Sequence, residues 1–155
     1  MANLRVRNVW WGVAILALGL VRPLPAQLEI GNWTRQQTPS MPSMTLTIQA
    51  CCGEGRRLTY HVVMKEMAAD LVVESRLDGT DAPVLMAGKP SGETMAIKRL
   101  DAHHASAVLK MNGNVFATSQ ATLSADGKTL TVLSDYSAQV GANPVGKVTE
   151  TWVKQ

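Results

Sequence analysis

The feature that most constrains this chain is an alternation of apolar and polar residues that recurs from Leu28 to the C-terminal end. The alternation is clearest over residues 44–50 and 58–64, and turn residues interrupt it at roughly ten-residue intervals. A period of two residues places alternate side chains on opposite faces of a strand and does not fit an amphipathic helix. The sequence therefore predicts an all-β fold.

Tight turns between neighbouring segments predict how these strands connect. Residues 52–55 (Cys-Gly-Glu-Gly) separate the two clearest strands, and residues 112–114 (Asn-Gly-Asn) and 124–128 (Ser-Ala-Asp-Gly-Lys) are typical hairpin sequences. Closing a sheet of successive hairpins removes its exposed edges. We expect an antiparallel up-and-down β-barrel of about eight to ten strands, preceded by an N-terminal signal helix.

The densest turn signals lie in the middle of the chain, in residues 78–101. Asp78-Gly79 predicts a turn, residues 88–92 (Gly-Lys-Pro-Ser-Gly) predict a break, and residues 94–101 predict a strand. Aspartate side chains accept hydrogen bonds from nearby backbone amides in turns. We therefore expect Asp78, Asp101 and Asp126 to set backbone geometry rather than transfer protons.

The first 26 residues have a different pattern. Arg5 and Arg7 precede an uncharged run at residues 9–21, and residues 23–26 (Pro-Leu-Pro-Ala) are typical of a cleavage site. The run is shorter than the ~20 residues of a spanning helix, which argues against the alternative of a membrane anchor. The pattern predicts a signal peptide at residues 1–26 and a barrel domain at residues 27–155. We expect a secreted or periplasmic protein with no stable membrane span after the leader is removed.

Removal of the leader also changes the charge of the protein. The chain has 15 basic and 12 acidic residues, and three of the basic ones, Arg5, Arg7 and Arg22, belong to the leader. The mature chain is therefore close to neutral. Nucleic-acid binding requires a basic surface that neutralises phosphates, so we expect no nucleic-acid partner.

The two cysteines, Cys51 and Cys52, are adjacent. Neighbours on a strand point to opposite faces and do not provide ordinary disulfide geometry, although an exported protein meets an oxidising compartment. Free thiols, a bridge between the neighbours and an intermolecular bridge all remain open, and we favour a pair at the edge of a turn with no special role. The second ligand pair of a zinc site is missing.

No motif predicts catalysis, and none predicts a metal or cofactor. His61 is expected to face solvent, and His103 and His104 are expected on opposite faces of one strand, where they cannot share a metal ion. Ser91 lacks the strand-to-helix context of a nucleophile elbow. We therefore expect a non-enzymatic protein.

Residues expected to face the barrel interior are the better candidates for function. Methionine fills irregular gaps and lines adaptable pockets, and Arg99 shares a face with Met95. Arg99 either binds a carboxylate inside the barrel or pairs with Asp101 or Asp78 at its rim. One expected inner face has unusually small side chains, which either leave a space or let the barrel close tightly: Val115, Ala117, Ser119, Ala121 and Leu123. The candidate ligand-contacting residues are Arg99, Met44, Tyr60, Met95 and Phe116.

Several segments occur in a recognisable order: Gly31-Asn32-Trp33, residues 45–48 (Thr-Leu-Thr-Ile), 78–84 (Asp-Gly-Thr-Asp-Ala-Pro-Val), 94–102 and 123–131. In these segments the chain from residue 30 to residue 155 resembles a family of small exported bacterial proteins grouped with lipocalin-like (calycin) barrels. The resemblance implies a barrel in which Trp33 plugs one end and an interior cavity is possible, and it transfers no catalytic residue. The family pattern favours an aromatic residue where this chain has Ala82.

These observations predict an exported, non-enzymatic, lipocalin-like barrel that binds a small apolar or amphipathic ligand in its interior. The alternative is a structural or protein-binding module of the cell envelope without a small-molecule ligand.

Overall fold

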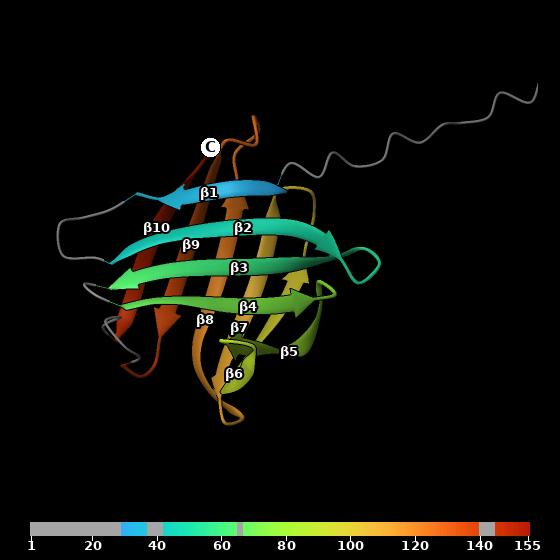
Figure 1. Cartoon of the computed structure of the whole chain (residues 1–155). Coiled ribbons are helices and arrows are strands. Elements are labelled where there is room, and N and C mark those ends of the chain that lie inside the picture. The colour runs from blue at the N-terminus through green and yellow to red at the C-terminus, as the bar shows by residue number, and fades with distance from the viewer. Residues whose placement is uncertain (1–28, 37–41, 65–66, 140–144) are drawn as a thin grey trace, which may run out of the picture.

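A closed, ten-stranded antiparallel barrel forms the structure, which is a computed structural model (Figure 1). The structure describes residues 29–36, 42–64, 67–139 and 145–155, and these residues contain strands and no helix. The strands are β1 (Gly31–Arg35), β2 (Ser43–Cys51), β3 (Gly55–Met64), β4 (Met67–Ser75), β5 (Asp78–Met86), β6 (Lys89–Arg99), β7 (His104–Met111), β8 (Asn114–Leu123), β9 (Thr129–Tyr136) and β10 (Gly146–Lys154). The predicted all-β, up-and-down barrel is confirmed.

The predicted leader and its cleavage site lie outside the described residues. Within the described part of the chain, no helix is long and apolar enough to cross a membrane.

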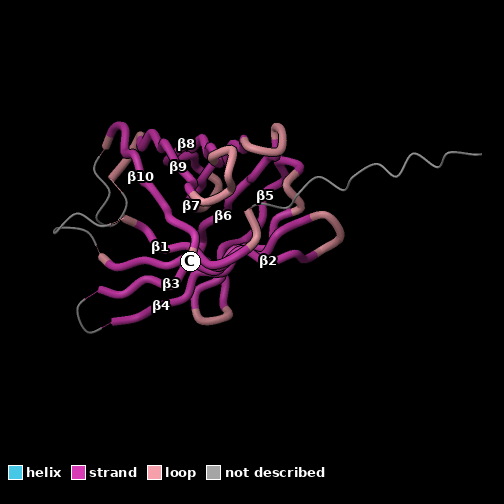
Figure 2. The backbone as a smooth tube through the Cα atoms, turned by 90° about the horizontal axis from the view of Figure 1, so that it is seen from above, coloured by secondary structure: helices cyan, strands magenta, loops and turns pink. Residues whose placement is uncertain are grey.

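Each strand pairs with its neighbours in sequence, and β1 pairs with β10 to close the barrel. In Figure 1, β1–β4 form a front layer that crosses β6–β10 behind it. The view from above in Figure 2 places β8, β9 and β10 on one side and β3 and β4 on the opposite side. The pairing between β4 and β5 spans residues 71–73 and 84–86, and the pairing between β1 and β10 is equally short. The two layers therefore enclose a common interior and meet along short pairings.

The predicted alternation sets which side chains face this interior. The buried residues include Leu46 and Ile48 of β2, and Val73 of β4 is fully buried. Trp33 is also fully buried; its indole Nε1 donates a hydrogen bond to the Glu29 carbonyl oxygen at 2.9 Å. The hydrophobic core contains Trp33, Leu46, Ile48, Leu58, Val73, Ala82, Val84, Ile97, Leu123 and Trp152.

Two of the predicted hairpins are present as expected. Asn112 and Gly113 join β7 to β8, both with positive φ (48° and 83°), as a tight two-residue hairpin requires. Gly127 has φ of 68°, and its amide donates a hydrogen bond to the Ser124 carbonyl oxygen at 2.9 Å. Local sequence is sufficient for these turns because glycine and asparagine adopt the left-handed conformation readily.

The central stretch differs from its prediction at both turn signals. Asp78-Gly79 is not the turn: β4 ends at Ser75 and β5 begins at Asp78. The Thr80 amide donates a hydrogen bond to Asp78 Oδ1 at 2.9 Å, and the pairing with β6 shifts register beyond Asp78. The Asp-Gly pair therefore marks a bulge.

The predicted break over residues 88–92 is correct only at Gly88, because β6 begins at Lys89 and continues through the rest. The turn lies one step earlier, at Ala87 and Gly88, which have φ of 49° and 76°. Ser91 Oγ donates a hydrogen bond to the Val84 carbonyl oxygen at 2.9 Å, which ties this irregular strand start to β5.

A second bulge corrects the predicted inner face of β8. Leu109 pairs with Ala117 and Lys110 pairs with Val115, so Phe116 is an extra residue on β8. Such an insertion reverses the inside–outside alternation of the strand on one side of the bulge relative to the other. Val115 is consequently 52% exposed, whereas Phe116 and Ala117 are both buried. The prediction that Val115 faces the interior is wrong.

The two adjacent histidines differ from their predicted placement. His103 lies in the turn before β7, which begins at His104, so the prediction that both lie on one strand is wrong. Asp101 Oδ1 accepts hydrogen bonds from the amides of His103 and His104 and holds this turn.

Cys51 and Cys52 form a disulfide with each other at the β2–β3 turn, which is one of the three states left open.

Candidate ligand-binding cavity

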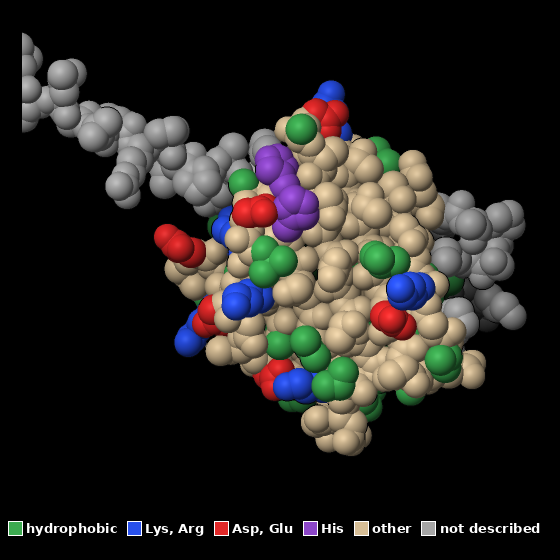
Figure 3. Space-filling view, turned by 180° about the vertical axis from the view of Figure 1, so that it is seen from behind, with side chains coloured by type: hydrophobic (Ala, Val, Ile, Leu, Met, Phe, Trp, Pro, Cys, Tyr) green, Lys and Arg blue, Asp and Glu red, His purple; other side chains and the backbone are tan. Residues whose placement is uncertain are grey.

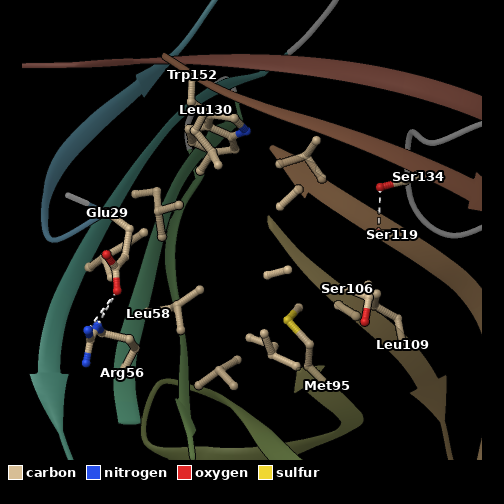
Figure 4. Close-up of a pocket in the computed structure, with 18 of the residues that line it drawn as sticks. Glu29, Arg56, Leu58, Met95, Ser106, Leu109, Ser119, Leu130, Ser134 and Trp152 are labelled. Atoms are coloured by element: carbon tan, nitrogen blue, oxygen red, sulfur yellow. Dashed lines mark hydrogen bonds and ion pairs between the residues drawn. The ribbon is translucent and has the colours of Figure 1, made fainter. Parts of the chain in front are cut away.

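A cavity of about 330 Å³ lies inside the barrel (Figure 4). Small-molecule sites are typically cavities of ~300–1,000 Å³, lined by apolar side chains with a few polar groups. Leu58, Met95 and Leu109 point into this space from different strands in Figure 4. All five candidate ligand-contacting residues line the cavity: Arg99, Met44, Tyr60, Met95 and Phe116.

An ion-pair cluster, formed by Glu29, Arg56 and Arg99, lies at one end of the cavity. Arg56 Nε donates a hydrogen bond to Glu29 Oε1 at 2.9 Å, and Arg99 Nη2 pairs with the same oxygen. Arg56 is 2% exposed, and its Nη1 also donates to the carbonyl oxygens of Glu54 and Gly55. The cluster therefore consists of two guanidinium groups that share one carboxylate, and the Arg56 guanidinium is buried.

The partner of Arg99 is Glu29, and the predicted rim pairing with Asp101 or Asp78 is wrong. Hydrogen bonds from the His103 amide and from His104 hold the pKa of Asp101 below its usual range. Those from the Thr80 hydroxyl and amide do the same for Asp78. Both carboxylates thus set local backbone geometry, as predicted.

Arg56 was not among the predicted site residues, although the alternation contains the signal for it. Counting back in steps of two from Leu58 places Arg56 on the inner face and Arg57 on the outer face. The structure shows this arrangement: Arg57 pairs with the exposed Glu74 outside the barrel, and Arg56 lines the cavity. Glu29 precedes β1, and its contact with the arginines was not predicted.

Further carboxylates, phenols, hydroxyls and two histidines line the cavity. Glu93, Glu150, Tyr60 and Tyr136 also line it. Burial raises the pKa of Tyr60, with the Glu150 carboxylate as the second cause, and burial likewise raises the pKa of Tyr136. Glu150 is paired with Arg35 at 2.5 Å. Glu93 lies on β6 with Arg99, and Tyr60 lies on β3 with Arg56, whereas Tyr136 and Glu150 come from β9 and β10.

The effect of burial on the Glu93 carboxyl group can be tested through the pH dependence of stability. Burial raises the pKa of its carboxyl group, so the native state holds a proton at pH values where the unfolded chain has released it. Stability should therefore fall as pH rises from the unfolded pKa through the folded pKa. We expect Glu93→Gln to raise the melting temperature at pH 7 and to leave it nearly unchanged at pH 3, measured by thermal unfolding. An equal shift at both pH values would contradict a buried, ionising Glu93.

His61 faces solvent as predicted, whereas His103 and His104 are among the residues that line the cavity. His61 Nδ1 is 2.6 Å from Asp70 Oδ1, and His104 Nδ1 is 2.8 Å from Asp101 Oδ2, with all four side chains about half exposed. Among the described residues, no group of three or more histidine, cysteine, aspartate or glutamate side chains is placed to hold a metal ion. On the face shown in Figure 3, basic and acidic side chains are interspersed.

Comparison of the chain with family models, curated proteins and solved structures finds no match. The barrel and its cavity are therefore characterised by their own geometry, and membership of a lipocalin-like family stays a prediction.

Proposed function

We propose that this chain is an exported, non-enzymatic, lipocalin-like barrel that binds a small apolar or amphipathic molecule in its interior. The observation that carries the proposal is the cavity of about 330 Å³ inside a closed barrel. A well-packed core leaves few voids larger than a water molecule, so a space of this size is more than a packing defect.

The chemistry of the cavity wall supports the same proposal. Most of the lining is aliphatic or aromatic, with charged groups confined to a few positions. Burial of an apolar ligand surface against such a wall is favourable by about 25 cal/mol per Å². Export is supported by the predicted leader and by the Cys51–Cys52 disulfide, since disulfides persist in oxidising compartments. A non-enzymatic role is supported by the polar contacts of the histidines and aspartates, which bind their own turns and strands.

Titration of the purified protein with dodecanol tests the proposal, with native mass spectrometry to detect any ligand retained from the cell. We expect saturable binding with one ligand per barrel. Ala107 lines the cavity from β7, so Ala107→Trp should fill the space and weaken binding at least about tenfold. Ala68 is exposed on β4, and Ala68→Trp is the matched control that should bind normally.

Two results would contradict the proposal. One is the absence of binding to the unaltered protein; the other is equal binding by the Ala107→Trp and Ala68→Trp variants. Either would favour the alternative of a structural or protein-binding envelope module. Circular dichroism of both variants would show that they retain the barrel.

A further inference from the structure

The two arginines at one end of the cavity hold more positive charge than their single carboxylate neutralises. Arginine stays protonated in proteins, so Arg56, Arg99 and Glu29 together carry one net positive charge at neutral pH. Burying charged groups is costly unless they are fully paired. Arg56 is buried and Arg99 is 35% exposed, so the cluster leaves a partly buried surplus of positive charge beside an apolar cavity.

Arg56 is fixed in place and incompletely paired. Its Nη1 donates to the carbonyl oxygens of Glu54 and Gly55 at 3.0 and 2.7 Å, which fixes the plane of the guanidinium group. Its Nη2 is buried and lies 2.7 Å from Glu29 Oε1 without the alignment of a hydrogen bond. A buried donor without an aligned acceptor is destabilising, and an anion with two oxygens would satisfy it.

Glu29 is attached to this end of the barrel without being part of a strand. It precedes β1, which begins at Gly31, and its carbonyl oxygen accepts the hydrogen bond of the Trp33 indole. Both arginines contact the same carboxylate oxygen, Oε1. The Glu29 side chain can therefore turn away from the arginines without breaking a backbone hydrogen bond of the barrel.

We propose that Arg56 and Arg99 form the binding site for the carboxylate head group of an amphipathic ligand, and that Glu29 competes for the same two arginines. This inference rests on the proposed function and adds the ligand's class and orientation. A ligand carboxylate can use both oxygens and provide the aligned acceptor that Arg56 Nη2 lacks. Its apolar part then lies along Leu58 and Met95 (Figure 4).

The test compares two probes that differ only in their head group, dodecanoate and dodecanol, on the full chain and its variants. Glu29→Gln removes the competing charge and should tighten dodecanoate binding about tenfold. Arg99→Gln should weaken dodecanoate binding by about the same factor. Dodecanol binding should change less than about twofold in both variants, because it carries no charge. Glu74→Gln, which breaks the exposed pair with Arg57, is the matched control and should change neither.

A measurement on the unaltered protein provides a check that does not depend on the folding of any variant. Raising the salt concentration should weaken binding of dodecanoate more than binding of dodecanol, because salt screens the attraction to the arginines. Dodecanol binding with no binding of dodecanoate, or equal responses of the two probes to Glu29→Gln and Arg99→Gln, would overturn this inference and leave the proposed function standing. Failure of both probes to bind would overturn both.

Discussion

Trp33→Ala should lower the free energy of unfolding by about 3–5 kcal/mol, as expected for a large buried aromatic side chain. Trp33 is fully buried in the core, and its indole hydrogen bond to the Glu29 carbonyl oxygen would be lost with it. The Lys154 ammonium lies 5.4 Å from the centre of its ring, which adds a cation–π contact between β1 and β10. Urea unfolding followed by circular dichroism measures the change.

The control for Trp33 is a hydrophobic residue at the surface. Val115 is 52% exposed on β8, so Val115→Ala should change the free energy of unfolding by less than about 0.5 kcal/mol. A loss below about 1 kcal/mol for Trp33→Ala would contradict the packing of this residue in the core.

Gly55→Ala should have the second large effect, a loss of about 3 kcal/mol, at the upper end of the range for overpacking. A Cβ atom at Gly55 would lie 2.4 Å from the Ser75 carbonyl oxygen and 3.2 Å from the Arg76 Cα atom. These are backbone atoms at the end of β4, which cannot move aside as a flexible side chain would. The start of β3, including Arg56, would have to shift instead.

Gly53, in the same turn, is the matched control. It has φ of +77° and no atom within 4 Å of an added Cβ, so Gly53→Ala should cost about 1 kcal/mol from backbone conformation alone. The two variants are compared by thermal and urea unfolding. Equal losses would show that the close approach of Gly55 to Ser75 does not constrain the turn.

Local pattern was sufficient for much of the fold. The inner faces of β2 and β3 follow directly from the alternation over residues 44–50 and 58–64, because each strand lies between two others and buries one face. The hairpin at Asn112-Gly113 follows from residues that tolerate positive φ. These features depend on nearby residues alone.

The errors occur where a partner strand decides the outcome. The bulge at Phe116 exists because β7 pairs with β8 in two registers on either side of it, and no residue of β8 signals that change. The Asp78-Gly79 pair has the composition of a hairpin turn but is placed as a bulge by its pairing with β6. A turn sequence indicates irregular backbone without specifying which irregularity.

The candidate site was predictable in part for the same reason. Arg99, Met44, Tyr60, Met95 and Phe116 all line the cavity. Arg99 was expected to meet either a carboxylate inside the barrel or a nearby aspartate. Its actual partner, Glu29, is 70 residues away in sequence. The curvature of the barrel brings Glu29 to Arg99 on β6, and sequence spacing gives no measure of that contact.

The pairing of β1 with β10 has a consequence for how the barrel is assembled. Trp33 pairs with Lys154, and the Gln155 amide donates a hydrogen bond to the Asn32 carbonyl oxygen at 2.9 Å. The first strand therefore acquires one of its two neighbours only when the last strand has emerged during synthesis. Contacts between such distant parts of a chain are slow to form, since a long loop must close first. Until that moment β1 has an unpaired edge, which is open to pairing with another chain.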